Sequence, residues 1–194
     1  PTVMKDLMAS MADIYQTFWI GKFLLLLRYL ALMTTITLPG LYVALTSYNP
    51  EVFRVQLALS VAGSRHAVPY PSFIEVFLML IMMELLLEAS IRLPKAIGPT
   101  ATTVGGLILG QAATEAGLVS NIMIIIVSLG AISNFVIPIS TFSFAVRVSK
   151  YFILLLSIFY GLVGVILGVF LLLAYMVSLD SFGKPYLTFR EENI

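Results

Sequence analysis

Long apolar runs separated by short charged clusters dominate the chain, and this pattern predicts helices that cross a membrane. Residues 29–50, 96–114, 116–146 and 151–179 contain no charged side chain at all. A spanning helix needs about 20 mainly apolar residues, so each of these stretches is long enough to cross a bilayer. Residues 73–91 are equally apolar but carry three glutamates, Glu75, Glu84 and Glu88.

The apolar runs and their end signals give the expected elements. We expect spanning helices at about residues 23–46, 72–91, 97–116, 118–138 and 151–179. Pro39 and Gly40 fall deep in the first helix and should kink or break it. The segment 97–116, rich in Gly, Ala and Thr, is either a full span or a broken, re-entrant one. Residues 51–70 are too polar to span and predict a short helix lying in the membrane interface.

The predicted fold is therefore an all-α, polytopic transmembrane helical bundle. We divide the chain into a juxtamembrane segment (1–22), a transmembrane domain (23–179) and a C-terminal tail (180–194). With five crossings and the start of the chain inside, the basic residues obey the positive-inside rule, but weakly. Those expected inside are Lys5, Lys22, Arg28, Arg92, Lys95, Arg147 and Lys150, and those outside are Arg54, Arg65, Lys184 and Arg190.

Composition supports a membrane protein and narrows the chemistry. The chain is 60% hydrophobic and 11% charged, whereas soluble domains are about 45–50% apolar and about 25% charged. A net charge of +1 gives no field for binding nucleic acid. The absence of cysteine excludes thiolate sites, and a lone His66 makes a metal site improbable. No catalytic motif or cofactor-binding motif is present, so we expect neither an enzyme nor a cofactor. A chain that begins at Pro1 is expected to be a piece of a longer protein.

Three ionisable residues on the second predicted helix form the most informative cluster. Glu84, Glu88 and Arg92 follow a spacing of four residues and so lie along one helix face. A charge at the centre of a spanning helix costs about 2.5–3.5 kcal/mol, so such a residue must face protein or water, or pair with a cation. One interpretation is an ion-conducting or proton-coupled path, and the other is a polar network that only holds helices together. Glu75 lies near the helix N-terminus, where the helix dipole favours an anion.

Small residues and prolines supply the remaining candidates. GxxxG patterns occupy residues 106–110 and 164–168, and small residues allow membrane helices to pack closely. A pore wall is the alternative for the segment 98–116, because its threonine and glutamine oxygens could face ions. The candidates for pore lining or gating are Glu84, Glu88, Arg92, Gly98, Thr102, Gly106, Gly110 and Gln111. The candidates for helix packing are Gly105, Gly161, Gly164 and Gly168, and those for hinges are Pro39, Gly40, Pro94 and Pro138.

Six stretches of the chain together form a recognisable set of motifs. The longest is residues 84–98, ELLLEASIRLPKAIG. The further stretches are 38–44 (LPGLYVA), 65–71 (RHAVPYP), 104–113 (VGGLILGQAA), 115–120 (EAGLVS) and 181–187 (SFGKPYL). In sequence and in order they resemble the GerA family, the A subunits of spore nutrient-germinant receptors, whose hallmark is the run 84–98. The family commonly has Arg at the position of Leu87 and Gly at that of Ser90. Its soluble N-terminal domain is absent from this chain, which resembles the membrane core alone.

The resemblance implies a role in endospore germination at the inner membrane of the spore. A subunits of the family work with a transporter-like B subunit and a C-subunit lipoprotein. They are thought to form a homo-oligomeric ring that passes monovalent cations when the nutrient is sensed. A relative encoded with the dipicolinic-acid transport genes matches this segment equally well. A secondary transporter would predict an inverted repeat, which we do not find, and a non-conducting membrane scaffold is the third alternative.

Overall fold

The computed structural model describes residues 3–9, 15, 17–94, 97–181 and 183–187, and helices make up most of this part of the chain. The long helices are α2 (Phe18–Ser47), α4 (Ser72–Arg92), α5 (Gly98–Glu115), α6 (Asn121–Phe135) and α7 (Ser140–Ser178). The short elements are α1 (Met4–Met8), η2 (Pro50–Val52), α3 (Val55–Arg65) and the two-residue strands β1 (Asp180–Ser181) and β2 (Lys184–Pro185). The prediction of an all-α fold is thus confirmed, apart from one minimal antiparallel strand pair.

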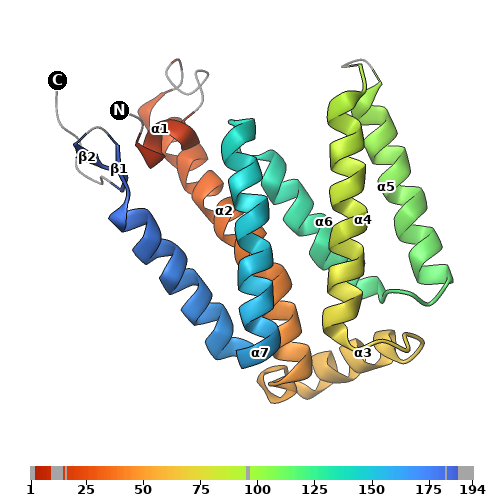
Figure 1. The fold of residues 1–194 in the computed structure, drawn as a ribbon. Coiled ribbons are helices and arrows are strands. Elements are labelled where there is room, and N and C mark those ends of the chain that lie inside the picture. Colours follow the sequence, from red (N-terminus) through yellow and green to blue (C-terminus); the bar gives the residue numbers. More distant parts are fainter. Residues whose placement is uncertain (1–2, 10–14, 16, 95–96, 182, 188–194) are drawn as a thin grey trace.

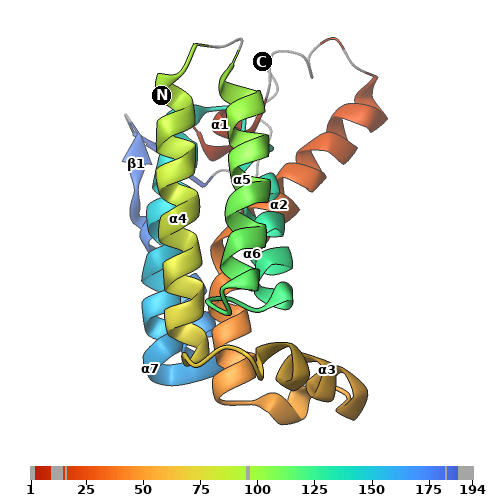
Figure 2. The same cartoon turned by 90° about the vertical axis from the view of Figure 1, so that its right-hand side faces the viewer.

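The long helices run roughly side by side, and the short elements lie at the two ends of this array (Figure 1). Helix α3 crosses one end, which we call the α3 end, while α1 and the strand pair lie at the opposite, α1 end (Figures 1 and 2). The short helix expected between residues 51 and 70 is therefore present and lies across the others. Within the described residues, α2 and α7 are the helices long and apolar enough to cross a membrane by length and composition.

Helix α2 begins earlier than expected and continues through Pro39 without a break. The proline ring removes one backbone hydrogen bond, and Figure 2 shows the N-terminal half of α2 slanting away from the direction of the C-terminal half. Directly after the proline, the carbonyl of Gly40 accepts a hydrogen bond of 2.5 Å from the Ser157 hydroxyl. A Cβ atom on Gly40 would lie 3.2 Å from Ile153, so glycine allows α2 and α7 to pack closely here.

The segment 97–116 forms a single helix, α5, that runs antiparallel to α4 (Figures 1 and 2). The segment is therefore not broken, because its helical hydrogen bonding continues from Gly98 to Glu115. Helix α6 is shorter than expected and has 15 residues, which corresponds to a length of about 22 Å. A core of large apolar side chains joins α2, α4, α6 and α7, and includes Tyr42, Met79, Met123, Val127 and Leu154.

Residues 151–179 do not form the single spanning helix that we expected. Gly161 has φ 58° and ψ −134°, a conformation open essentially to glycine alone, and α7 reverses direction there (Figure 1). A Cβ atom on Gly168 would lie 2.9 Å from the side chain of Ile153 on the preceding arm. In a straight helix these residues would be about 22 Å apart. The apolar run therefore folds into a helical hairpin, which periodicity alone could not reveal.

The hairpin brings both described ends of the chain to the α1 end (Figure 1). The Met4 amide donates a hydrogen bond of 3.1 Å to the carbonyl of Tyr186. Met4 and Met8 share an apolar cluster with Leu32 and Val146, against which Tyr186 also packs. The segments that we separated as juxtamembrane and tail are thus in contact, although residues 188–194 lie outside the described part.

Candidate functional site

Glu84 lies at the centre of a cluster of buried charges between α4 and α7. Its Oε1 atom is 2.7 Å from the Arg147 guanidinium, and its Oε2 atom is 3.3 Å from the Lys150 ammonium. The side chains of Arg147 and Lys150 are 5% and 9% exposed, and that of Glu84 is 31% exposed. The guanidinium also lies 4.1 Å from the centre of the Phe144 ring. Glu84 therefore does not face bare hydrocarbon.

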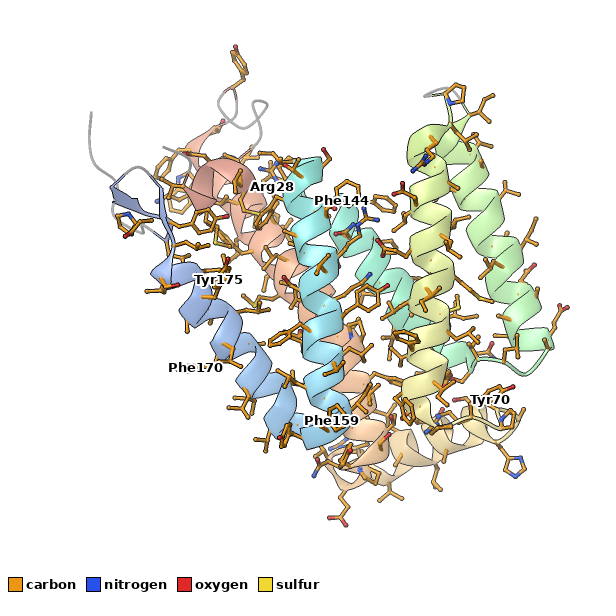
Figure 3. All side chains as sticks on the ribbon, viewed as in Figure 1. Arg28, Tyr70, Phe144, Phe159, Phe170 and Tyr175 are labelled. Carbon is orange, nitrogen blue, oxygen red and sulfur yellow. The ribbon has the colours of Figure 1, made fainter. Side chains whose placement is uncertain are left out.

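The cluster lies well inside the helical array. Glu84 is two turns from the α1 end of α4, about 12 Å by helical rise. Arg147 and Lys150 lie on one face of α7 because they are three residues apart. Phe144, which marks this part of α7, lies towards the α1 end (Figure 3). Two cations and one carboxylate thus meet in a region of low polarity.

Cavities lie on both sides of Arg147. A small one, of about 20 Å³, is bordered by Thr35, Pro39, Arg147 and Lys150 among others, which is room for roughly one water molecule. A larger one, of about 230 Å³, lies between Asn134, Ser143 and Arg147, near the connection of α6 and α7. Its lining also includes Pro138, one of the residues that we predicted as hinges.

Arg147 and Lys150 were missed as partners of Glu84 in the sequence. We used them to divide two apolar stretches and so placed them in a connection between helices. Helix α7 instead begins at Ser140 and carries both cations within its first arm. The available signal was their spacing of three residues, which places two long basic side chains on the same helical face.

Glu88 and Arg92 form a separate and exposed pair on α4. The Arg92 guanidinium donates to Glu88 Oε1 at 2.9 Å, and the side chains of Arg92 and Glu88 are 78% and 47% exposed. This is the interaction expected for residues four positions apart in this order. The three residues of the predicted cluster are therefore divided, because Glu84 turns to α7 while Glu88 and Arg92 stay at the surface.

The small residues of α5 lie where α4 and α5 come close. The Thr102 hydroxyl lies 2.5 Å from the Ser90 hydroxyl and 2.8 Å from the Gly98 carbonyl, within hydrogen-bonding distance of both. A Cβ atom on Gly98 would lie 3.1 Å from the Ser90 carbonyl. Cβ atoms on Gly105 and Gly106 would lie 2.9 and 3.5 Å from Leu86. These positions thus lie against α4 in the isolated chain.

The other candidates on α5 and at the connections differ in their surroundings. A Cβ atom on Gly110 would lie 3.7 Å from Ile124 of α6, an ordinary packing distance, whereas Gln111 is exposed. Pro94 lies just after α4, and its carbonyl accepts hydrogen bonds from the amides of Ile97 and Gly98 at 2.9 and 3.0 Å. Gly110 is therefore packed between helices, and Gln111 is free to contact another molecule.

Glu75 forms a second buried charge site near the α3 end. Its side chain is completely buried, and its Oε2 atom lies 3.3 Å from Nε of Arg65. Its Oε1 atom accepts hydrogen bonds from the Ser120 amide at 2.6 Å and from the Ser120 hydroxyl at 2.5 Å. The Ser120 hydroxyl in turn accepts from the Met123 amide and caps α6. Glu75 therefore ties α4 to α6 and to Arg65 at the end of α3.

Within the described residues, no group of three or more His, Asp or Glu side chains has the arrangement of a metal site. His66 is exposed just after α3. The arrangements that the structure does provide are the buried cluster at Glu84, the exposed pair Glu88–Arg92 and the buried charge site at Glu75. All three suit charge pairing and helix association more than the making or breaking of covalent bonds.

Comparison with known proteins agrees with the motifs in the sequence. Residues 1–192 match the family described as Bacillus/Clostridium GerA spore germination protein. The chain belongs to the GerA family. It is 39% identical to spore germination protein B1 of Bacillus subtilis (strain 168) over 90% of this chain and 36% of that protein. It is 39% identical to spore germination protein GerLA of Bacillus cereus over 97% of this chain and 38% of that protein.

A third relative carries a name that refers to the membrane. The uncharacterized membrane protein YfkQ of Bacillus subtilis (strain 168) is 38% identical over 97% of this chain and 37% of its own length. Together with the two long apolar helices, this indicates membrane association. The chain spans a little over a third of the length of these relatives. No solved structure matches the chain.

The GerA motifs meet in space at the sites described above. The hallmark run 84–98 contains Glu84, the exposed pair and the connection from α4 to α5. The stretches 65–71 and 115–120 are far apart in the chain, yet Glu75 binds Arg65 of the first and Ser120 of the second. The stretches that resemble the family's motifs therefore contain side chains that hold the helices of the bundle together.

Proposed function

We propose that this chain is the membrane core of a subunit of a spore germinant receptor, and that copies of it assemble around an axis to conduct monovalent cations. The family membership and the germination proteins among its relatives support the germination role. In the proposed receptor, the subunit resides in the inner membrane of the spore. It works there with a transporter-like B subunit and a lipoprotein C subunit.

The observation that carries the conduction proposal is that the α4–α5 hairpin, whose exposed surface is otherwise mainly apolar, leaves a few polar side chains uncovered. This hairpin lies at one edge of the array (Figure 1), and it leaves Glu88, Arg92 and Gln111 uncovered. In hydrocarbon such polar and charged side chains are costly, so they should face water or another protein surface. In a ring of copies that turned these side chains toward a shared axis, each side chain would meet both water and a neighbouring copy. Rings of acidic side chains favour cations in channels.

The interior of a single copy is a poor cation path. The buried cluster contains two cations, Arg147 and Lys150, against the single carboxylate Glu84, and this excess of positive charge repels other cations. We therefore place the conducting path between copies, and assign Glu84 to holding the helices that surround it.

The distribution of basic residues supports an orientation in the membrane. With α7 as a hairpin, the chain would cross six times and keep both described ends on one side. Apart from the buried Arg147 and Lys150, the basic residues toward the α1 end are Lys5, Lys22, Arg28, Arg92 and Lys184. Arg54 and Arg65 belong to the α3 end, while Lys95 and Arg190 lie outside the described residues. Because basic residues concentrate on the cytoplasmic side, we propose that the α1 end faces the cytoplasm.

Conductance of the reconstituted full-length protein tests the proposal. We expect potassium currents in planar bilayers, and we expect Glu88→Gln to lower the preference for cations over anions. Glu51→Gln is the matched control, since it removes an exposed carboxylate on η2 at the other end of the bundle. A protein that assembles but carries no current would refute conduction.

A scaffold without conduction is the second candidate, and the ion pairs of Glu84 favour it. In that case Glu84 and Glu88 serve only to hold helices and copies together. The scaffold predicts no current from the native protein, and loss of assembly in Glu88→Gln as measured by native mass spectrometry. The conduction proposal predicts that Glu88→Gln still assembles and alters the current.

A further inference from the structure

The buried cluster around Arg147 carries more positive than negative charge. Within the described residues, the ion pairs of Arg147 and Lys150 both lead to the same carboxylate, that of Glu84. Burying a charge without a counter-charge is unfavourable, and a buried ion pair breaks even only with good geometry and further hydrogen bonds. The cluster is therefore one negative charge short.

Arg147 also has an unused donor. Its Nε atom is buried and has no hydrogen-bond partner, although the guanidinium contacts Glu84 through its Nη1 atom. Buried polar atoms in proteins nearly always have a partner, so an exception needs an explanation. A guanidinium has a fork of donors that matches the oxygens of a carboxylate or phosphate.

The cavity of about 230 Å³ beside Arg147 has further features that suit an anion. Its lining includes Asn134, Ser140 and Ser143, which carry amide or hydroxyl groups. The Ser143 hydroxyl and the Asn134 side-chain oxygen are already bonded to each other at 3.1 Å. Ser140 is the first residue of α7, and the N-terminus of a helix offers backbone donors and a positive dipole end to an anion.

The geometry points to an anion site in this cavity. We propose that Arg147, together with Asn134 and the N-terminus of α7, binds an anionic oxygen group of the phosphate or carboxylate type. The bound group supplies the missing negative charge beside the Arg147 guanidinium, which lines the cavity. The site lies toward the α1 end, near the connection between α6 and α7 (Figures 1 and 3), where either a lipid headgroup or a small soluble anion can reach it. This proposal does not depend on conduction.

Binding to the purified full-length protein tests the site. In dodecyl maltoside, whose headgroup is uncharged, inorganic phosphate is titrated against chloride at constant ionic strength while the thermal unfolding midpoint is followed. We expect a saturable rise of the midpoint for the native protein, and phosphate binding at least about tenfold weaker in Arg147→Gln, since a hydrogen bond between charged groups is lost. Arg147→Gln leaves Glu84 and Lys150 as a balanced pair, so it should fold. Lys22→Gln removes an exposed charge on α2 and should bind like the native protein.

A second experiment, in which lipids are added, distinguishes the two sources of the anion. Addition of phosphatidylglycerol, but not phosphatidylcholine, should raise the midpoint if a lipid headgroup occupies the site, and Arg147→Gln should abolish this rise. If the ligand is a soluble anion, phosphate alone should act. A native protein that responds to neither phosphate nor phosphatidylglycerol overturns the proposal, as does Arg147→Gln with native affinity. Should Arg147→Gln fail to fold, Asn134→Ala decides, and unchanged binding in that variant overturns the proposal.

Discussion

The carboxylate of Glu84 lies 2.7 Å from the guanidinium of Arg147, so a residue of α4 is held by a residue of α7 far along the chain. Replacement of Glu84 by Gln leaves Arg147 and Lys150 as two buried cations without a counter-charge. Removing one partner of a buried pair typically costs about 3–5 kcal/mol. We expect Glu84→Gln to lower the thermal unfolding midpoint strongly, as measured by scanning fluorimetry in detergent.

Two variants separate this effect from the general loss of a charge. Arg147→Gln retains one carboxylate and one cation, and should therefore destabilise less than Glu84→Gln. Glu88→Gln breaks only an exposed pair, which is worth about 1 kcal/mol or less. If Glu84→Gln were as stable as Glu88→Gln, the ion pairs of Glu84 would contribute nothing to the fold.

Glu75 should hold α3 in place at its end of the bundle. In Glu75→Gln the buried acceptor for Arg65 loses its charge, and the contact that links α3 to α4 and α6 weakens. We expect faster amide hydrogen exchange in α3, measured by mass spectrometry, with little change in α2. Glu51→Gln lies on exposed η2 near α3 and should leave that exchange unchanged. Equal exchange in both variants would contradict the assigned role.

The reversal of α7 depends on glycine at particular positions. A Cβ atom on Gly164 would lie 2.1 Å from the Leu156 carbonyl, and one on Gly161 would lie 2.9 Å from Tyr48 at a positive φ. We expect Gly161→Ala to cost about 1–3 kcal/mol from backbone strain alone, and Gly164→Ala to prevent close packing of the two arms. Gly63→Ala in α3 meets no atom within 4 Å and should be neutral or slightly stabilising. Unfolding midpoints of the three variants check this order.

Labelling of single cysteines can count the membrane crossings, because the chain contains no cysteine. Lys22→Cys and Asp180→Cys should react with an impermeant maleimide from the same side of an oriented vesicle, and His66→Cys from the opposite side. A single helix in place of the hairpin would put Lys22→Cys and Asp180→Cys on opposite sides. That result would restore the arrangement of five crossings.

Much of the helical framework could be predicted from apolar run length, since α2, α4 and α5 lie within a few residues of their expected limits. The hairpin could not, because both arms of α7 are apolar and uncharged around Gly161, so the change of direction leaves no trace in hydropathy. It depends instead on close contact among Gly164, Gly168 and the preceding arm, which is a tertiary property.

The candidate site could be predicted only in part. The spacing of Glu84, Glu88 and Arg92 indicated that all three lie along one helix face, but it could not indicate which partners Glu84 would find. Arg147 and Lys150 lie far away in sequence, and their position inside a helix followed from a start at Ser140 that we did not predict. In addition, Leu87, one turn along α4 from Glu84, is buried and apolar. The cations that meet Glu84 here come from α7 instead.

The hydrogen bond between the Met4 amide and the Tyr186 carbonyl has a mechanical consequence. It fastens the beginning of the described chain to its end, with Met8 and Val146 in the same apolar cluster. A force applied at Met4 would therefore reach Tyr186 through this contact, without passing through the long helices.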